Sequence, residues 1–318
     1  MDTHAPDHLV IRCDHYAPTL KMVGFEDGQS GSLVSRNGIT METIGSQQLY
    51  TLLEESERSE RSSNTKVRNG TGHFVSSYLD LAYKIAELQF RNRDFVFLFR
   101  GQSRDFKNRS GNTSLRPTIL RSASGDEIRQ RYELLGQAER ALIDQYRFLG
   151  AERVKRQQLI RWAILQHYEV CPTPLLDVSQ SIRIAASFAS MTDSSEAYFF
   201  VLGVPNISGA ITASAEAGLT VLRLASVCPP DAVRPHVQEG FLLSEYPELT
   251  SLEQKGHYEN YEIDFGLRLV AKFRFDPQTF WQKNEGFPPV TRQALYPSAA
   301  NDPLLELAET IKRSLPSS

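Results

Sequence analysis

Cysteine, long apolar runs and net charge are all scarce in this sequence. Its 318 residues include three cysteines, Cys13, Cys171 and Cys228, with no CxxC spacing. An odd number without disulfide or zinc spacing predicts free thiols in a reducing compartment. No apolar run approaches the ~20 residues that a membrane helix needs, and the first residues lack the basic and apolar regions of a signal peptide. We therefore expect a cytoplasmic protein without membrane contact.

The signatures of common nucleotide and metal sites are also missing. The sequence contains no GxGxxG, no P-loop, no HExxH and no zinc-spaced group of cysteines and histidines, so we expect no metal site. A net charge of −3 gives no support to nucleic-acid binding driven by overall charge. The hydrophobic share of 41% is ordinary for a soluble globular protein. Function must therefore be sought in individual polar residues.

The composition and the hydrophobic periodicity of the sequence change near residue 70. The segment from Glu55 to Gly72 is rich in Ser, Arg, Asn and Gly without hydrophobic periodicity, which predicts a linker or a long loop. Beyond it, apolar residues recur at helix and strand spacing. We interpret residues 1–70 as an N-terminal extension and linker, and residues 71–318 as one folded domain.

Helices precede strands in this domain. Apolar residues at helical spacing predict helices over 71–85 (with Thr71 as the N-cap), 126–149, 156–168 and 304–311. Apolar or alternating runs predict strands over 95–99, 197–202, 220–225 and 267–275, the last one half-buried. Because there is no regular βαβ alternation, we expect an α+β fold, with a helical N-terminal part packed on a mixed or antiparallel sheet.

A rigid turn with polar neighbours follows the helix that ends near Tyr168. Pro172 and Pro174 fix the backbone there and prevent the helix from continuing. Ser179 and Ser181 then suit the start of another helix, because their hydroxyls accept bonds from unpaired backbone N–H groups. That helix has a face of small residues, which allows close approach to a sheet. Polar groups in such a turn are either structural caps or a ligand site, and both interpretations stay open.

A second polar feature ends the strand over 95–99. This apolar run leads into Arg100, Gly101 and Gln102. A long cation at the end of a buried strand rarely lacks a partner, and the glycine lets a ligand or another backbone approach. Arg100 belongs to a basic segment, residues 91–121, for which a solvated loop surface is the simplest interpretation and phosphate binding the alternative.

These segments, taken in order, resemble the FRG domain, a family named for its Phe/Tyr-Arg-Gly motif. The resemblance covers roughly residues 71–312, and it is carried by Phe99-Arg100-Gly101-Gln102, Leu115-Arg116-Pro117, Gln166-His167-Tyr168, Pro174-Leu175-Leu176-Asp177, Gln238-Glu239-Gly240-Phe241 and Leu295-Tyr296-Pro297. The chain departs from the family pattern in three ways. Glu169-Val170-Cys171 adds a residue before the proline, Pro174 replaces an arginine, and Val178-Ser179 replaces Trp-Thr. The resemblance by itself implies no activity.

A second resemblance does imply an activity. ADP-ribosyltransferases of the Arg-Ser-Glu type place an arginine at the end of the first core strand, a Ser-Thr-Ser-like segment before a helix, and a later glutamate beside a short strand. This sequence has Arg100, Ser179-Gln180-Ser181 and Glu239 in the same order. The resemblance implies an ADP-ribosyltransferase-like fold and an enzyme that uses NAD as a substrate. Its acceptor would be an intracellular protein or nucleic acid, as for toxin and defence effectors.

The same resemblance implies roles for these residues. Cleaving the nicotinamide–ribose bond of NAD creates an oxocarbenium-like cation, which the carboxylate of Glu239 would stabilise. Arg100 would bind the diphosphate or the ribose, and Ser179 and Ser181 would orient the ribose or brace the glutamate. Tyr168 would stack on the nicotinamide ring. The remaining residues expected to bind NAD are Gly101, Gln102, His167 and Asp177.

Simpler interpretations stand beside each of these roles. Asp177 can cap a helix or pair with Arg100, His167 can be a hydrogen-bonded structural residue, and the two serines can be plain caps. Glu239 can be an ordinary surface carboxylate. For the whole chain, the alternatives are a non-catalytic module that binds a nucleotide or an RNA phosphate, and an NAD glycohydrolase that uses water as the acceptor.

Overall fold

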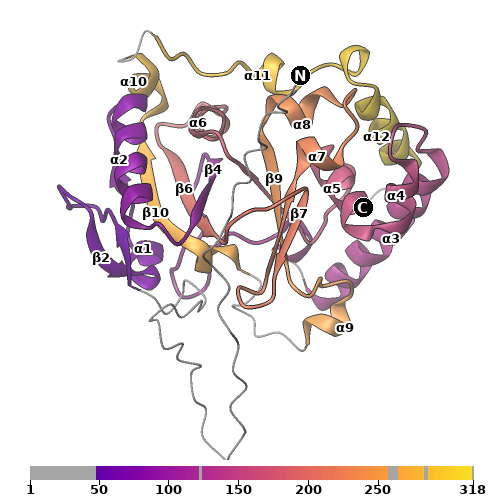
Figure 1. Cartoon of the computed structure of the whole chain (residues 1–318), viewed down its shortest axis with the longest axis horizontal. Coiled ribbons are helices and arrows are strands. Elements are labelled where there is room, and N and C mark those ends of the chain that lie inside the picture. Colours follow the sequence, from indigo (N-terminus) through magenta and orange to yellow (C-terminus); the bar gives the residue numbers. More distant parts are fainter. Residues whose placement is uncertain (1–47, 122–123, 257–263, 283–285, 317–318) are drawn as a thin grey trace, which may run out of the picture. The chain divides into compact units, whose positions relative to one another are not determined.

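An eight-stranded sheet organises the chain. The computed structural model describes residues 48–121, 124–256, 264–282 and 286–316, and within them the strand order is β3-β10-β6-β4-β5-β9-β8-β7 (Figure 1). Its strands are β3 (His73–Phe74), β4 (Val96–Gln102), β5 (Leu176–Ser179), β6 (Ala197–Val204), β7 (Ile211–Ser214), β8 (Leu219–Arg223), β9 (Gly240–Glu245) and β10 (Leu269–Phe275). β3 runs parallel to β10 and the other neighbours are antiparallel, so the sheet is mixed.

Helices cover this sheet, which confirms the predicted α+β class. A separate hairpin, β1 (Gln48–Thr51) with β2 (Glu60–Ser63), precedes it. The helices of the described residues are α1 (Asn64–Asn69), α2 (Tyr78–Arg91), α3 (Gly125–Gln145), α4 (Ala151–Arg156), α5 (Gln158–His167), α6 (Ile182–Ala189), α7 (Leu224–Val227), α8 (Val233–Val237), α9 (Leu252–Lys255), α10 (Pro277–Gln282), α11 (Arg292–Leu295) and α12 (Pro303–Ser314).

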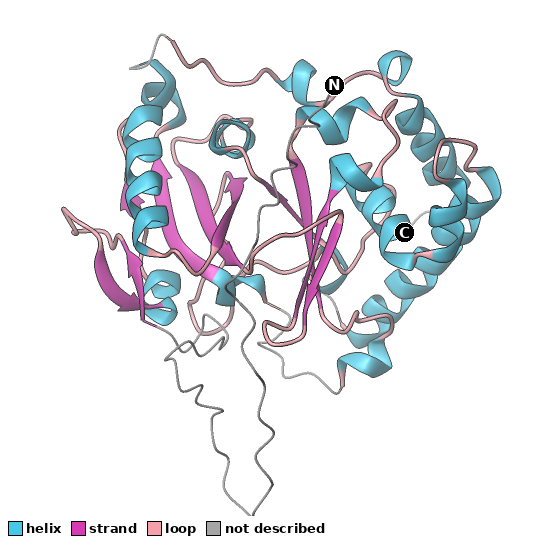
Figure 2. Ribbon diagram, viewed as in Figure 1, coloured by secondary structure: helices cyan, strands magenta, loops and turns pink. Residues whose placement is uncertain are grey.

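Two half-sheets meet at a single residue pair. β4 pairs with β6 along its whole length, and β5 pairs with β9 along its whole length. Between β4 and β5, however, the one paired position is Phe99 with Ser179. Figure 2 shows the strands as two groups that diverge from this junction. Side chains on either side of the junction can therefore face each other across a space.

Three apolar cores hold the layers together. One packs α2, α6 and α10 against β4, β6 and β10, and another packs α3, α5 and α12 against β8 and β9 (Figure 1). The third combines Leu98 and Phe200 from one half-sheet with Val178 and Leu243 from the other. The half-sheets are thus joined by side-chain packing much more than by backbone hydrogen bonds.

The structure confirms the predicted strands in the sheet and most of the long helix. In α3, Ile128, Leu135 and Leu142 are buried as its periodicity predicts. A capping box starts this helix, since the Ser124 hydroxyl accepts from Glu127 N and the Glu127 carboxylate accepts from Ser124 N. The predicted end of the helix was wrong, because α3 ends at Gln145 and Leu149 is 70% exposed.

The predicted linker over 55–72 was also wrong for its second half. Residues 60–69 form β2 and α1, and the Asn64 amide donates to the carbonyls of Gly266 and Leu269. Tertiary partners about 200 residues away in the sequence stabilise this polar segment, and local periodicity cannot reveal such partners. The predicted boundary at residue 70 therefore falls inside a packed region.

Two further elements differ from their predictions. The helix expected from Thr71 begins at Tyr78, where Ser77 is the N-cap, because residues 73–74 instead pair with β10. β10 is buried on both faces, since six of its seven residues are buried whichever face they point to. The prediction that this strand is half-buried was therefore wrong. Lys272, in its middle, is 1% exposed, and its Nζ donates to the carboxylate of Asp105 at 2.8 Å.

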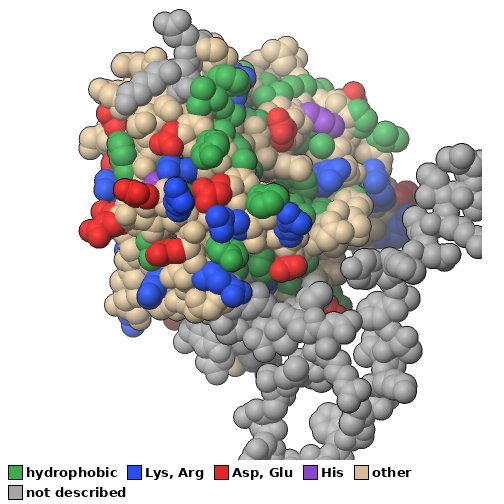
Figure 3. All heavy atoms as spheres, turned by 60° about the vertical axis from the view of Figure 1, so that its left-hand side comes forward, with side chains coloured by type: hydrophobic (Ala, Val, Ile, Leu, Met, Phe, Trp, Pro, Cys, Tyr) green, Lys and Arg blue, Asp and Glu red, His purple; other side chains and the backbone are tan. Residues whose placement is uncertain are grey.

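α2 also presents a second apolar stripe, which faces solvent. Leu79, Tyr83 and Phe90 are 52%, 75% and 68% exposed, although Leu81, Ile85 and Leu88 on the other face are buried. Figure 3 shows this side of the molecule, where hydrophobic side chains alternate with charged ones. Charged side chains of the same helix, paired as Lys84 with Asp80 and Arg91 with Glu87, therefore interrupt the stripe.

Two of the three cysteines lie in the described residues. Cys171 and Cys228 are free and buried, whereas Cys13 lies outside the described residues. Within the part of the chain that the structure describes, no helix is long and apolar enough to cross a membrane.

Candidate ligand site at the sheet junction

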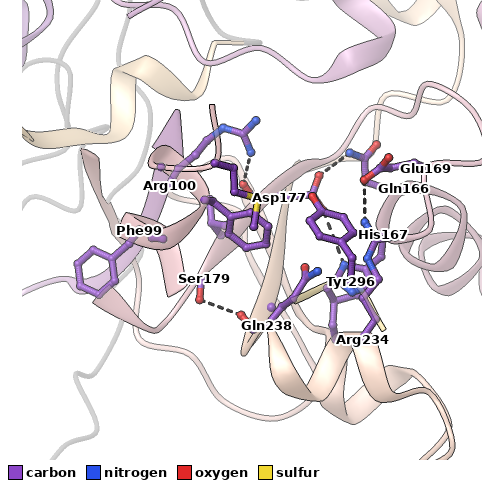
Figure 4. Close-up of a pocket in the computed structure, with 17 residues that line it drawn as sticks. Phe99, Arg100, Gln166, His167, Glu169, Asp177, Ser179, Arg234, Gln238 and Tyr296 are labelled. Carbon is purple, nitrogen blue, oxygen red and sulfur yellow. Dashed lines mark hydrogen bonds and ion pairs between the residues drawn. The ribbon is translucent and has the colours of Figure 1, made fainter. Parts of the chain in front are cut away.

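A pocket of about 290 Å³ lies where the two half-sheets separate (Figure 4). β4, β5 and β9 form its floor, and α5, α6 and α8 supply its walls. Its lining residues are Phe99, Arg100, Gly101, Gln166, His167, Glu169, Asp177, Val178, Ser179, Ala185, Phe188, Met191, Leu224, Arg234, Gln238, Gly240 and Tyr296. The ring of Phe99 points away from the polar cluster in Figure 4. The pocket thus combines cations, carboxylates and aromatic groups.

Gly101 sets the distance between β4 and α6. A Cβ atom at this position would lie 1.7 Å from the carbonyl oxygen of Ala185, which is backbone and cannot yield. No residue with a side chain fits there, so the requirement for glycine is one of close approach. This contact holds α6 on the sheet and brings Phe188 and Met191 to the pocket wall.

Arg100 is the cation on the β4 side. Its Nη1 donates to the backbone carbonyl of Asp177, and its Nε is buried without a hydrogen-bond partner among the described residues. Loss of solvent, together with the nearby charge of Arg121, lowers the pKa of Arg100 to about 10, so the group stays charged at neutral pH. A buried N–H without a partner is uncommon in native structures and is consistent with a site for an anion or hydroxyl of a ligand.

Asp177 is the carboxylate that faces this arginine. Gln166 Nε2 donates to its Oδ2 at 2.5 Å, and His167 Nδ1 lies 3.9 Å from its Oδ1. The Thr173 hydroxyl donates to Gln166 Oε1 at 2.6 Å, which fixes the orientation of the amide. Although burial acts to raise it, the pKa of Asp177 is lowered by His167, by the charge of Arg100 and by Gln166. Asp177 is therefore ionised at neutral pH.

The interpretation of Asp177 as a helix cap was wrong, because it lies within β5 and its carboxylate does not accept from a helix N-terminus. His167 sits beside it and is 3% exposed. Burial lowers the pKa of His167, and its Nε2 has no hydrogen-bond partner among the described residues. This imidazole is neutral at pH 7.

Arg234 and Glu169 form the opposite wall. Arg234 Nη2 donates to Glu169 Oε1 at 2.7 Å, and the guanidinium lies 4.5 Å from the ring centroid of Tyr296. Glu169 has φ of +55°, a left-handed conformation that non-glycine residues rarely adopt. Such strain is common at functional sites, where surrounding contacts maintain it. Here Arg234 supplies one of those contacts.

Two of the three residues expected to act together, Arg100 and Ser179, lie on neighbouring strands, and Glu239 lies in the turn just before the next strand. Ser179 pairs with Phe99 of β4 on one side and with Gly240 of β9 on the other, so Arg100 and Glu239 flank the paired positions. The Ser179 hydroxyl donates to the Gln238 carbonyl at 2.9 Å and thereby ties β5 to the turn before β9. The side chain of Glu239 is exposed and does not line the pocket.

Three other expected residues lie outside the lining. Ser181 caps α6, where its hydroxyl accepts from Ile184 N at 3.4 Å. Tyr168 is buried, and its hydroxyl donates to the carboxylate of Asp302 rather than facing a ligand. Gln102 ends β4 beyond the pocket. The aromatic residues that do face the pocket are Phe188 and Tyr296, which contact each other edge to face.

Five of the lining residues with polar side chains were not predicted as site residues: Gln166, Glu169, Arg234, Gln238 and Tyr296. Gln166, Gln238 and Tyr296 stand in segments that carry the resemblance to the FRG domain, and Glu169 stands in one of the departures from it. Their convergence depends on the packing of α5, α8 and the segment after α11, which sequence periodicity does not reveal. As for metals, no group of three or more His, Cys, Asp or Glu that could hold an ion occurs among the described residues.

One protein-family model matches part of this chain. Residues 96–197 match the model of the FRG domain. This segment runs from β4 to the start of β6, so it contains Arg100, Asp177 and Ser179 but not Arg234 or Tyr296. No curated protein and no solved structure matches the chain.

Proposed function

We propose, on the premise that residues 96–197 form an FRG domain, that the pocket binds NAD and that the chain transfers ADP-ribose to an intracellular acceptor. The observation that carries the proposal is the strand register at the junction. Ser179 pairs with both Phe99 and Gly240, so the backbones of Arg100 on β4, Ser179 on β5 and Glu239 in the turn just before β9 are neighbours beside the pocket. That order is the one expected for ADP-ribosyltransferases of this type.

The reaction breaks the bond between C1′ of the ribose and the nicotinamide nitrogen. The electron pair of that bond leaves with nicotinamide, and a nucleophile of the acceptor forms the new bond to C1′ and loses its proton. The transition state carries positive charge on the ribose, so a fixed carboxylate nearby lowers the barrier. Asp177, ionised and held by Gln166, is the carboxylate that lines the pocket, and Glu239 is the second candidate, on the exposed turn just before β9.

The other lining groups fit the remaining parts of the ligand. The guanidinium of Arg100 suits a phosphate or the ribose hydroxyls, which accept its planar set of N–H donors. Phe188 and Tyr296 offer aromatic surface to the nicotinamide ring. Ser179 has its hydroxyl committed to Gln238, so its contribution is to hold the turn that carries Glu239.

The test is to incubate the full chain with NAD labelled in its adenosine part, with and without cell extract. Nicotinamide release and transfer of the label to a macromolecule are then measured. We expect Arg100→Lys to weaken NAD binding roughly 10-fold or more, the cost of losing charge-assisted hydrogen bonds. We expect Asp177→Asn or Glu239→Gln to lower turnover by roughly 100-fold, as for other preorganised electrostatic groups. Glu309→Gln, an exposed change on α12, is the matched control.

The exposure of Glu239 favours a second function, a non-catalytic module that holds a nucleotide or an RNA phosphate in the same pocket. Such a module would bind without releasing nicotinamide, keep its affinity in Glu239→Gln, and weaken steeply with salt if phosphates dominate. Release of nicotinamide without label transfer would instead identify a glycohydrolase. Absence of both NAD binding and turnover would overturn the proposal.

A further inference from the structure

A second pocket, of about 370 Å³, adjoins the first along α6. Met191, just after this helix, lines both pockets. α6 also contributes to each of them, with Phe188 facing the first pocket and Ser187 facing the second. Arg292 of the second pocket lies 5.5 Å from the ring centroid of Tyr296, which lines the first. The two pockets are therefore neighbours that share a wall.

Trp281 gives the second pocket a rigid aromatic surface. Its ring stacks on Tyr78 at 5.7 Å and 17°, and Tyr78 stacks in turn on Phe287 at 5.4 Å. The indole N–H donates to the Ser190 hydroxyl at 3.0 Å, which fixes the rotation of the ring. Trp281 is half-buried and lines the pocket, so a planar base can extend the stack.

Charged groups of both signs flank this indole. Asp193 and Arg292 are exposed and line the same pocket. Carboxylates accept hydrogen bonds from ribose hydroxyls, as in dinucleotide-binding folds, and arginine pairs with phosphate oxygens. An aromatic plane, a carboxylate and a guanidinium together match the base, ribose and phosphate of a nucleotide.

Size favours one ligand across both pockets. The first pocket lies at the lower end of the ~300–1,000 Å³ range of small-molecule sites, which is small for a dinucleotide. Resting on the proposed function, we propose that the second pocket holds the adenosine half of NAD, with adenine on Trp281, its ribose at Asp193 and a phosphate at Arg292. The first pocket then holds the nicotinamide half.

Tryptophan fluorescence tests this assignment directly. The chain has two tryptophans, and Trp162 is 1% exposed within the helical core, so a ligand-dependent change reports on Trp281. NAD and ADP-ribose are expected to quench the emission, whereas nicotinamide mononucleotide, which lacks adenosine, is expected to leave it unchanged. Trp281→Phe removes the signal while keeping an aromatic plane, and it establishes the contribution of Trp162.

Affinities measured by calorimetry provide the second readout. Trp281→Ala should weaken NAD and ADP-ribose binding by roughly 5- to 150-fold, the range for loss of one base stack, and leave nicotinamide mononucleotide unaffected. Because Trp281→Ala also removes core packing, Arg292→Gln and Asp193→Asn on the exposed rim repeat the comparison. Arg129→Gln, an exposed arginine on α3, is the matched control.

The possible outcomes distinguish the adenosine site in the second pocket from the proposed function as a whole. Weaker NAD binding in Trp281→Ala and Arg292→Gln with unchanged binding of nicotinamide mononucleotide supports the assignment. The assignment is overturned if NAD binds and nicotinamide is released without quenching of the fluorescence, and if Arg292→Gln has the same NAD affinity as Arg129→Gln. The proposed function would still stand in that case. Absence of NAD binding in the unmodified chain overturns both proposals.

Discussion

At the residue scale, the Arg-Gly pair at the end of β4 joins two different physical roles. Arg100 presents a charged guanidinium to the pocket, and Gly101 allows the backbone of α6 to pass against the strand. The sequence predicts both roles in outline, because a cation and a glycine at the end of a buried strand are unusual. The sequence does not show that the close partner of Gly101 is Ala185.

Gly101→Ala should therefore disrupt the fold. The added Cβ would meet the Ala185 carbonyl at 1.7 Å, and separating α6 from β4 would cost about 3 kcal/mol or more. Gly136→Ala in the middle of α3 meets no atom closer than 3.8 Å, so it should stabilise by about 1 kcal/mol through helix propensity. Urea unfolding of both variants measures the difference. Equal stabilities would show that α6 can move away without cost.

At the element scale, the helices and strands that were predicted from the sequence are those with a clear apolar pattern. α3 was predicted because burial of one face imposes a helical spacing on its apolar residues, and β6 because burial of both faces makes it a continuous apolar run. α1 was not predicted, because its stability comes from polar bonds to distant segments. Arg68 of this helix donates to Asp264 at 2.9 Å in a buried ion pair, and Asp264 also accepts from Leu115 N. Such an element looks like a loop in the sequence.

Asp264→Ala should show how strongly α1 is held. Removing the carboxylate leaves a buried guanidinium without its partner, which typically costs about 3–5 kcal/mol. Asp126→Ala breaks an Asp–Arg pair of the same 2.9 Å length, but that pair is exposed, so its loss should cost no more than about 1 kcal/mol. Thermal or urea unfolding compares the two. A small effect of Asp264→Ala would mean that residues 64–69 contribute little to stability.

At the scale of the whole molecule, the site could be predicted only in part. The sequence indicated Arg100, Asp177, Ser179 and His167, which lie on elements with clear patterns. The sequence placed Tyr168 in the pocket, but the structure has Tyr296 there, whereas Tyr168 is buried against Asp302. Both tyrosines stand in motifs, and only the packing decides which of them faces the pocket. Residues from α8 and the C-terminal part reach the pocket through the tertiary fold alone.

The stability of the whole molecule should fall as the pH decreases from about 7 to 5. Burial lowers the pKa of His167, so the unfolded chain, with a histidine pKa of about 6.5, binds a proton that the native state does not. Stability from this group is therefore complete above pH 6.5 and is lost as the pH falls through the lower native pKa. His167→Gln should flatten the dependence of unfolding free energy on pH, measured by urea titration at each pH. An unchanged slope would exclude His167 as the cause, leaving His73, whose pKa is also lowered by burial.

The strand order has a consequence for how the chain acquires its structure. The family-matching segment, residues 96–197, contains β4, β5 and the first residue of β6, yet β5 needs β9 and β6 needs β10 as its other neighbour. During synthesis, β6 would wait until residue 275 has been made before its second edge is covered. A fragment limited to residues 96–197 would expose unpaired edges with apolar faces, which favour aggregation. We therefore expect that the segment that matches the family model does not fold on its own.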